Sequence, residues 1–205
     1  HDVPALPTDT KLSQPMGVGY EQQREVIEMC FERRISLIAS ALGPPPDWMI
    51  EQGRAKGVKV AALAGTVEHA RRHVEAGVDI VVAQGYEAGG HTGTVSTMVL
   101  VPEVVDAVSP VPVLAAGGIG NGREVTASLA LGAKGVWLGS VWLTTKEAET
   151  HPVVKEKFLR ATSSDTVRSR SLTGKPARQL RTAWTDAWED PANPDPLPMP
   201  LQPLL

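Results

Sequence analysis

Apolar residues in this chain follow two patterns that alternate along the sequence. Short runs are apolar at every position, which is typical of strands in a parallel sheet that is covered on both faces. Between these runs, apolar residues recur every three or four positions, which predicts helices. The runs predict strands at residues 35–40, 59–63, 79–83, 113–116 and 136–138. The periodic segments predict helices at residues 20–34, 47–56, 67–76, 101–108, 122–131 and 152–161.

The alternation of strand and helix predicts an α/β fold with a parallel sheet. Two arrangements fit: a TIM (β/α)8 barrel and an open, doubly wound sheet. Glycine-rich segments follow three consecutive strands, and a barrel gathers successive loops at one mouth. An open sheet concentrates its site at a switch point instead. We therefore favour the barrel, of which this chain would hold the C-terminal five βα units and a C-terminal tail.

Three segments are expected along the chain. Residues 1–18 predict an irregular loop, residues 19–161 the partial barrel, and residues 162–205 a C-terminal extension that is proline-rich from about residue 191. Five strands cannot close a barrel that needs eight. The first and last strands would each keep an unpaired edge, so we expect the chain to associate, and a homo-oligomer is left open.

Composition narrows the classes of partner. The 205 residues carry a net charge of −3 and a pI of about 6.0, which gives no electrostatic case for nucleic acid. No apolar run approaches the ~20 residues of a membrane span. Cys30 is the only cysteine, so an intrachain disulfide is excluded and a reducing, cytoplasmic compartment is the simpler expectation. His69 and His73 lie four residues apart without a third ligand, which favours a solvated helix face over a metal site.

Two strand ends carry small residues that suit a phosphate. Gly117-Gly118 follow the fourth predicted strand, and Gly139-Ser140 follow the fifth. In many barrels the loops after the last two strands bind phosphate through backbone N–H groups. Ser140 could add a hydroxyl donor. Tight turns alone would also explain such glycines, but the repetition on consecutive strands favours phosphate. The spacing after Gly118 is not that of a dinucleotide fingerprint.

The third predicted strand ends in the loop Gln84-Gly85-Tyr86-Glu87-Ala88-Gly89-Gly90-His91. Glycines allow a backbone to approach a ligand closely. A histidine in such a loop can move a proton near neutral pH, which makes His91 the candidate catalytic residue. Glu87 could bind a ligand or orient backbone amides, and both readings stay open.

These segments resemble the nitronate monooxygenase family, formerly called 2-nitropropane dioxygenases. The resemblance rests on residues 83–91, 115–119 and 131–136, on Gly139-Ser140, and on the segment Gly174-Lys175-Pro176-Ala177-Arg178, which by itself predicts only a packing or ion-pair role. Order and spacing agree over about residues 20–182. The family's first strands have no counterpart in this chain. Many relatives also carry Thr-Arg-Phe where this chain has Ser140-Val141-Trp142.

The resemblance implies an FMN-dependent TIM-barrel oxidoreductase. It implies that Gly117, Gly118, Gly139 and Ser140 hold the FMN phosphate, that Gln84, Gly85 and Gly90 lie along the flavin, and that His91 is catalytic. The implied substrates are a small nitronate, or a nitroalkane, and O2, and the products are a carbonyl compound and nitrite. A flavin-dependent enoyl-thioester reductase that uses NAD(P)H shares the glycine–glycine–histidine loop, and an inactive truncated barrel is the non-enzyme alternative.

Overall fold

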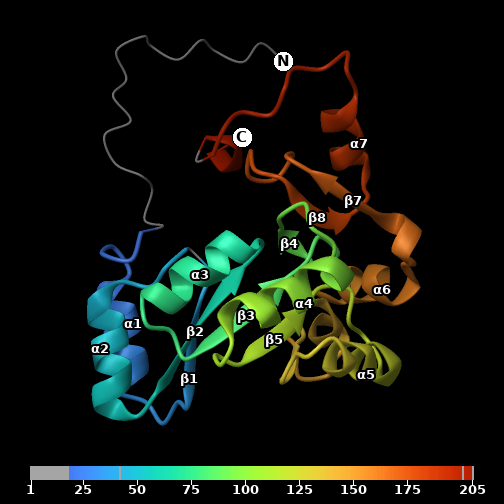
Figure 1. Ribbon diagram of the computed structural model, residues 1–205. Coiled ribbons are helices and arrows are strands. Elements are labelled where there is room, and N and C mark those ends of the chain that lie inside the picture. Colours follow the sequence, from blue (N-terminus) through green and yellow to red (C-terminus); the bar gives the residue numbers. More distant parts are fainter. Residues whose placement is uncertain (1–18, 42, 200, 205) are drawn as a thin grey trace.

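The computed structural model describes residues 19–41, 43–199 and 201–204, so the segment predicted as an N-terminal loop lies outside the described residues. A five-stranded parallel sheet forms the centre of the molecule (Figure 1). Its strands lie where the apolar runs predict them: β1 (Leu37–Ser40), β2 (Lys59–Ala64), β3 (Ile80–Gln84), β5 (Val113–Ala116) and β6 (Gly135–Trp137).

Six α-helices lie at the predicted places along the chain: α1 (Arg24–Phe31), α2 (Asp47–Lys56), α3 (Val67–Glu75), α4 (Thr97–Val108), α5 (Gly122–Ala130) and α6 (Pro152–Arg160). Helix α1 begins four residues after its predicted start at Tyr20. Thr66 caps α3 by accepting the N–H of His69. The prediction for α4 was wrong at its start, because the helix begins four residues before Val101 and holds Pro102 in its interior.

The strands lie in the sheet in the order in which they occur along the chain, β1-β2-β3-β5-β6. Every neighbouring pair is parallel. A doubly wound sheet would reverse this order at its switch point, whereas a barrel adds each strand beside the last. The topology therefore agrees with five consecutive βα units of a barrel, and β1 and β6 form the two edges of the sheet.

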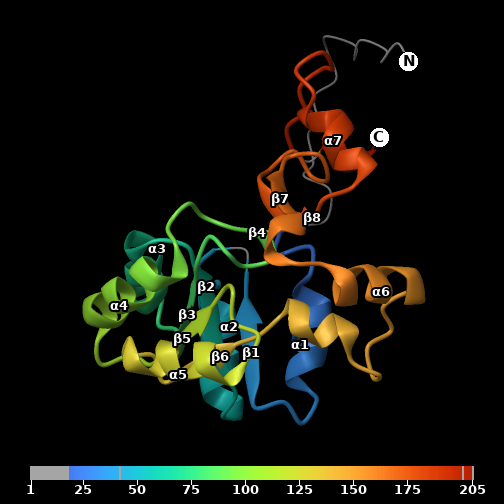
Figure 2. The same ribbon diagram turned by 90° about the vertical axis from the view of Figure 1, so that its right-hand side faces the viewer.

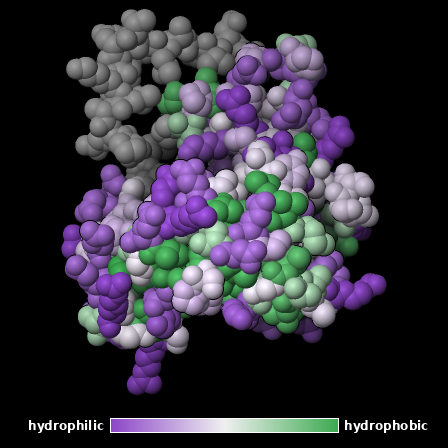
Figure 3. Space-filling view, viewed as in Figure 1, coloured by the Kyte–Doolittle hydropathy of each residue, from purple (hydrophilic) through white to green (hydrophobic). Residues whose placement is uncertain are grey.

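The two faces of the sheet are covered differently. One face packs against the helices in a single cluster that includes Val60 and Val81 from the strands and Met49 and Leu100 from α2 and α4. The opposite face is lined by strand residues alone, with Val82 and other buried or half-buried apolar side chains. Large apolar side chains also reach the surface on the helical side (Figure 3), among them Met98 and Val99 of α4.

A second, antiparallel sheet lies above the first in both ribbon views (Figures 1 and 2). Its order is β4-β8-β7, built from β4 (Gly90–His91), β8 (Ala177–Leu180) and β7 (Thr166–Ser169). Helix α7 (Ala183–Glu189) and three short 3-10 segments complete the described chain: η1 (Ser140–Thr144), η2 (Ser163–Asp165) and η3 (Gln202–Leu204). The sequence patterns predicted none of the elements after residue 162.

His73 corrects a prediction from the sequence. It was assigned to a solvated helix face, but its side chain is 2% exposed. Its Nε2 lies 2.9 Å from the carbonyl oxygen of Leu63, at the end of β2. Because a carbonyl only accepts, Nε2 carries the hydrogen and donates it. The buried ring therefore secures the end of a strand.

Candidate functional site

Adjacent strands bring the predicted ligand loops to one edge of the parallel sheet. Gln84 at the end of β3 lies opposite Ala116 of β5, and Ala116 lies opposite Trp137 of β6. The segments that follow, led by Gly85, Gly117 and Leu138, therefore leave the sheet side by side. This is the carboxyl edge, where parallel α/β sheets place their binding sites.

The loop that starts at Gly85 packs directly against the Gly117 turn. The N–H of Gly85 donates to the carbonyl of Ala116 at 2.9 Å. A Cβ at Gly85 would come within 2.5 Å of the Thr97 backbone, so no larger residue fits. Gly117 has a φ of 111°, and a Cβ there would lie 3.0 Å from the nitrogen of Ala88. Both glycines are required by close backbone packing.

Glu87 anchors the start of α4. Its Oε2 accepts the N–H of Thr97 at 2.9 Å and lies 2.8 Å from the Thr97 hydroxyl. Burial raises the pKa of Glu87, but the hydrogen bonds from Thr97 and the charge of Arg178 outweigh it and hold the pKa below 4.5. Of the two readings of Glu87, the structure shows the one in which it orients a backbone amide.

Two backbone N–H groups at the predicted phosphate loops are free to bind a ligand. Within the described residues, neither Gly118 nor Gly139 donates its N–H to a protein acceptor, and both residues are exposed. A Cβ at Gly139 or Gly90 would meet nothing within 4 Å, so space remains beside both. Ser140 lies close to Gly89, since its Oγ would be 2.7 Å from a Cβ there. Free donors and open space fit a phosphate group.

His91 is exposed on β4 and is held by the C-terminal extension. It lies opposite Ala177 in the antiparallel pairing of β4 with β8. Its Nε2 lies 2.7 Å from Oγ1 of Thr173, in the turn between β7 and β8. Sequence reasoning missed Thr173, because nothing in the local pattern links it to a loop 82 positions away.

Two arginines of the extension lie close to the ring of Tyr86. The guanidinium carbon of Arg178 lies 4.5 Å from the ring centroid, and that of Arg168 lies 5.5 Å from it. Arg178 also donates to the carbonyl of Tyr86 at 3.1 Å, and Arg168 donates to the carbonyl of Thr92 at 2.9 Å. The extension thus fastens the loop on both sides of His91, which agrees with a packing role for the segment that ends in Arg178.

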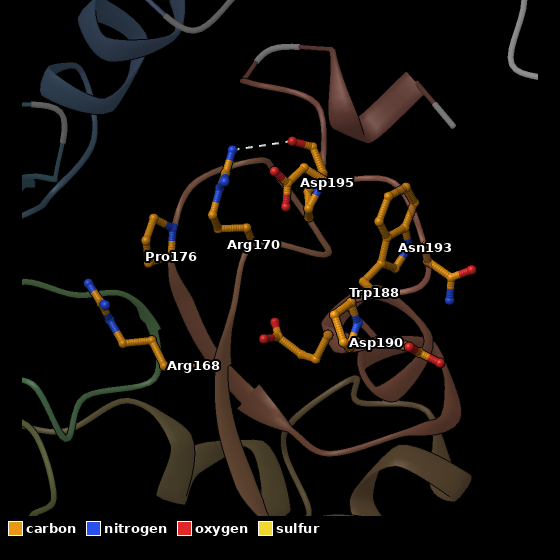
Figure 4. A pocket seen from close by; sticks show the side chains of 10 residues that line it. Arg168, Arg170, Pro176, Trp188, Asp190, Asn193 and Asp195 are labelled. Atoms are coloured by element: carbon orange, nitrogen blue, oxygen red, sulfur yellow. Dashed lines mark hydrogen bonds between the residues drawn. The ribbon is translucent and has the colours of Figure 1, made fainter.

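A cavity of about 570 Å3 lies between the β7–β8 hairpin and the chain after α7 (Figure 4). None of the predicted site residues lines it. Arg170 reaches across one end and donates to the carbonyl of Pro196 at 3.2 Å. The residues that line this cavity are Arg168, Arg170, Pro176, Trp188, Glu189, Asp190, Pro191, Asn193, Asp195 and Pro196. It is separate from the carboxyl edge of the parallel sheet.

Clusters of metal-ligating side chains and membrane-spanning helices are both absent from the described residues. No group of three or more His, Cys, Asp or Glu side chains there is placed to hold a metal ion. No helix in the same part of the chain combines the length and apolar character that crossing a bilayer requires.

Comparison with known proteins decides the family. A family model described as nitronate monooxygenase matches residues 6–204. The chain belongs to the nitronate monooxygenase family. A protein of Mycobacterium tuberculosis that is named as a monooxygenase is 65% identical over 208 residues, which cover 100% of this chain and 55% of that protein. The chain thus spans about half the length of this family relative.

Solved structures agree with the family assignment. FabK of Thermotoga maritima is 37% identical, with a TM-score of 0.74 over 82% of this chain and 55% of that one. A nitroalkane oxidase of Streptomyces ansochromogenes is 32% identical, with a TM-score of 0.73 over 81% of this chain and 50% of that one. The parallel βα units described above are therefore those of a family of TIM-barrel enzymes.

Proposed function

We propose that the protein containing this chain is an FMN-dependent oxidoreductase that oxidises alkyl nitronates with O2. The observation that carries the proposal is the meeting of the His91 loop with the two glycine-rich strand ends, where Gly118 and Gly139 offer free N–H groups. Membership in the nitronate monooxygenase family and the likeness to a nitroalkane oxidase support it.

The fit of the strand-end loops to FMN follows from their donors. Gly118, Gly139 and Ser140 would bind the phosphate, since two N–H groups and a hydroxyl can donate to its oxygens. Gln84, Gly85 and Gly90 would lie along the flavin, and Gly117 provides the turn that brings Gly118 to the edge. When bound, FMN would take an electron from the nitronate, and O2 would complete its oxidation to a carbonyl compound and nitrite.

His91 would act directly on the substrate, either by removing a proton or by orienting the anion. With a neutral nitroalkane, a ring nitrogen that carries a lone pair removes the proton from the carbon next to the nitro group. With a nitronate, which has already lost that proton, the ring would only orient the anion. Because the two substrates differ by this single proton, comparing their turnover isolates the work of His91.

The test is His91→Ala in the intact protein, assayed with a nitroalkane. We expect bound flavin to be kept, because its phosphate contacts come from other loops, and kcat/KM to fall by ~10²–10⁴-fold. His69→Ala, which changes an exposed histidine on α3, is the matched control. A kcat/KM within about threefold of the wild type (~0.65 kcal/mol) would exclude His91 as the base.

Assays of the intact protein also test the alternative activity, that of an enoyl-thioester reductase. An enoyl-thioester reductase would oxidise NAD(P)H when an enoyl thioester is added and would leave nitronates unchanged. Cofactor released by heat and separated by chromatography identifies the flavin. Recovery of FAD would contradict the FMN assignment, and a colourless intact protein would contradict both enzyme proposals.

A further inference from the structure

The turn between β7 and β8 carries the hydroxyl that touches His91. We propose that Thr173 is a positioning residue, which keeps the ring hydrogen of His91 on Nε2 and so leaves Nδ1 as the nitrogen that receives the substrate's proton. This inference rests on the proposed function and extends it to a residue outside the parallel sheet.

The contacts of the Thr173 hydroxyl favour one assignment of donor and acceptor. Its Oγ1 lies 2.7 Å from Nε2 of His91 and 3.3 Å from the carbonyl oxygen of Lys175. The N–H of Lys175 points at the same oxygen from 3.4 Å. A carbonyl can only accept and a backbone N–H can only donate. The one assignment that satisfies all three contacts sends the hydroxyl hydrogen to the Lys175 carbonyl, while Oγ1 accepts from Nε2–H and from the Lys175 N–H.

This arrangement uses the full capacity of the hydroxyl, which has one donor and two acceptor positions. In this assignment Nε2 carries the ring hydrogen of His91, and a neutral imidazole of that tautomer has its lone pair on Nδ1. When Nδ1 takes up a proton, Nε2–H continues to donate to Thr173. The hydrogen bonds need no rearrangement during the proton transfer.

The turn that presents Thr173 is itself held in place. Gly174 is buried with a φ of 79°, and a Cβ there would lie 2.1 Å from the carbonyl oxygen of Leu197. The N–H of Gly174 donates to the carbonyl of Arg170 at 2.8 Å. The chain after α7 thus packs against the turn, so the position of the hydroxyl relative to His91 is set by packed backbone.

The test compares Thr173→Val, which removes the hydroxyl at nearly constant shape, with Thr173→Ser, which keeps it. Thr126→Val removes an exposed hydroxyl from α5 and serves as the matched control. The first readout is the nitrogen NMR spectrum of the His91 ring in the intact protein, assigned by the signals lost in His91→Gln. We expect Nε2 to carry the hydrogen in the wild type, in Thr173→Ser and in the control, and the tautomers to mix in Thr173→Val.

The second readout is turnover by the flavin-loaded protein. For a neutral nitroalkane we expect kcat/KM of Thr173→Val to fall at least about tenfold, as for the loss of a hydrogen bond to a group that becomes charged. For the preformed nitronate we expect less than about a threefold change, because no proton is removed. Thr173→Ser, which keeps the hydroxyl, should retain most of the wild-type kcat/KM for the nitroalkane.

The outcomes separate the two proposals. An unchanged tautomer in Thr173→Val, or equal losses in the Val and Ser variants, would overturn the role of Thr173. If the wild type turned over neither substrate, the proposed function would fail. The NMR spectrum would still decide whether Thr173 sets the tautomer, because it requires neither substrate nor turnover.

Discussion

Single glycines decide where a ligand can approach the carboxyl edge. Gly118 has a φ of 69°, and a Cβ there would meet the Cβ of Glu87 at 3.1 Å, so any substitution strains the protein itself. Gly139 has a φ of −120°, and a Cβ there meets open space. Gly139 is therefore the position at which a side chain would disturb a bound phosphate more than the fold.

We expect Gly139→Val to weaken FMN binding, because the added methyl groups would occupy the space in front of the free N–H. The flavin dissociation constant of the intact protein measures this. The control is Gly122→Val at the start of α5, where a Cβ also meets nothing within 4 Å. Equal affinities in the two folded variants would place the phosphate elsewhere.

His73 illustrates a histidine whose role is structural. Burial lowers its pKa below 6.5, the Leu63 carbonyl opposes this, and the charges of His69 and Arg72 lower the pKa further. Its Nδ1 is buried with no hydrogen-bond partner among the described residues. The neutral ring is thus the form that the folded protein prefers.

This preference predicts acid sensitivity. The unfolded chain binds a proton at His73 near pH 6.5, whereas the folded protein does so only at lower pH, so stability is present above ~6.5 and falls as the pH drops. The slope cannot exceed about 1.4 kcal/mol per pH unit for one group. Chemical unfolding of the intact protein at several pH values measures it. His73→Gln should flatten the slope, whereas His69→Gln should not.

The sequence allowed us to locate the residues that lie in the loops after predicted strands. The glycine pairs stand directly after apolar runs, and His91 lies in the loop that follows another such run, so the meeting of these loops at one edge could be predicted from the parallel fold. Thr173 and the anchoring of Thr97 by Glu87 depend on contacts between distant segments. The burial of His73 likewise depends on a carbonyl of another element. Local patterns carry no information on such contacts.

At the scale of elements, the sequence predicts the strands and helices whose buried residues form a regular apolar pattern. All five parallel strands were predicted because their residues are apolar on both faces. The hairpin of β7 and β8 was missed because its sequences, TVRS and ARQL, are largely polar. Its strands are stabilised by pairing with each other and with β4, and the hydrophobic pattern of a strand does not reveal such pairing.

A cap fixes the element that follows the Gly117-Gly118 turn. Asn121 accepts the N–H of Arg123 at 3.0 Å, and Glu124 accepts the N–H of Gly120 and of Asn121. We expect Asn121→Ala to lower the free energy of unfolding by ~1 kcal/mol, because helix N–H groups lose their acceptor. Asn121→Ser, which keeps a cap, should lose only a fraction of that. Equal stability of the Ala variant in denaturant titrations would show that the cap is redundant.

At the scale of the whole molecule, the described sheet has two unpaired edges. β1 and β6 each have one neighbour, and the face between them is lined by strand residues such as Leu37, Leu114 and Trp137. At ~25 cal/mol per Å2, a few hundred Å2 of uncovered apolar surface is comparable to a domain's stability of ~5–15 kcal/mol. Exposed edges of this kind invite pairing with other chains.

We therefore expect residues 1–205 alone to associate or to unfold without a sharp transition. Sedimentation and thermal unfolding measure this. Leu37→Lys, which places a charge on the uncovered face of β1, should reduce association, whereas Leu129→Lys on the exposed side of α5 should not. A monomer with a cooperative transition would contradict the expectation.

The pairing of His91 with Ala177 has a consequence for biosynthesis. Ala177 is translated 86 residues after His91. At ~5–20 residues per second, the ribosome needs about 4–17 s to make that interval. During this time the parallel strands and their glycine loops can already fold, while the histidine still lacks the partner strand that fixes it. The contact that positions His91 therefore forms only after the β7–β8 hairpin has been made.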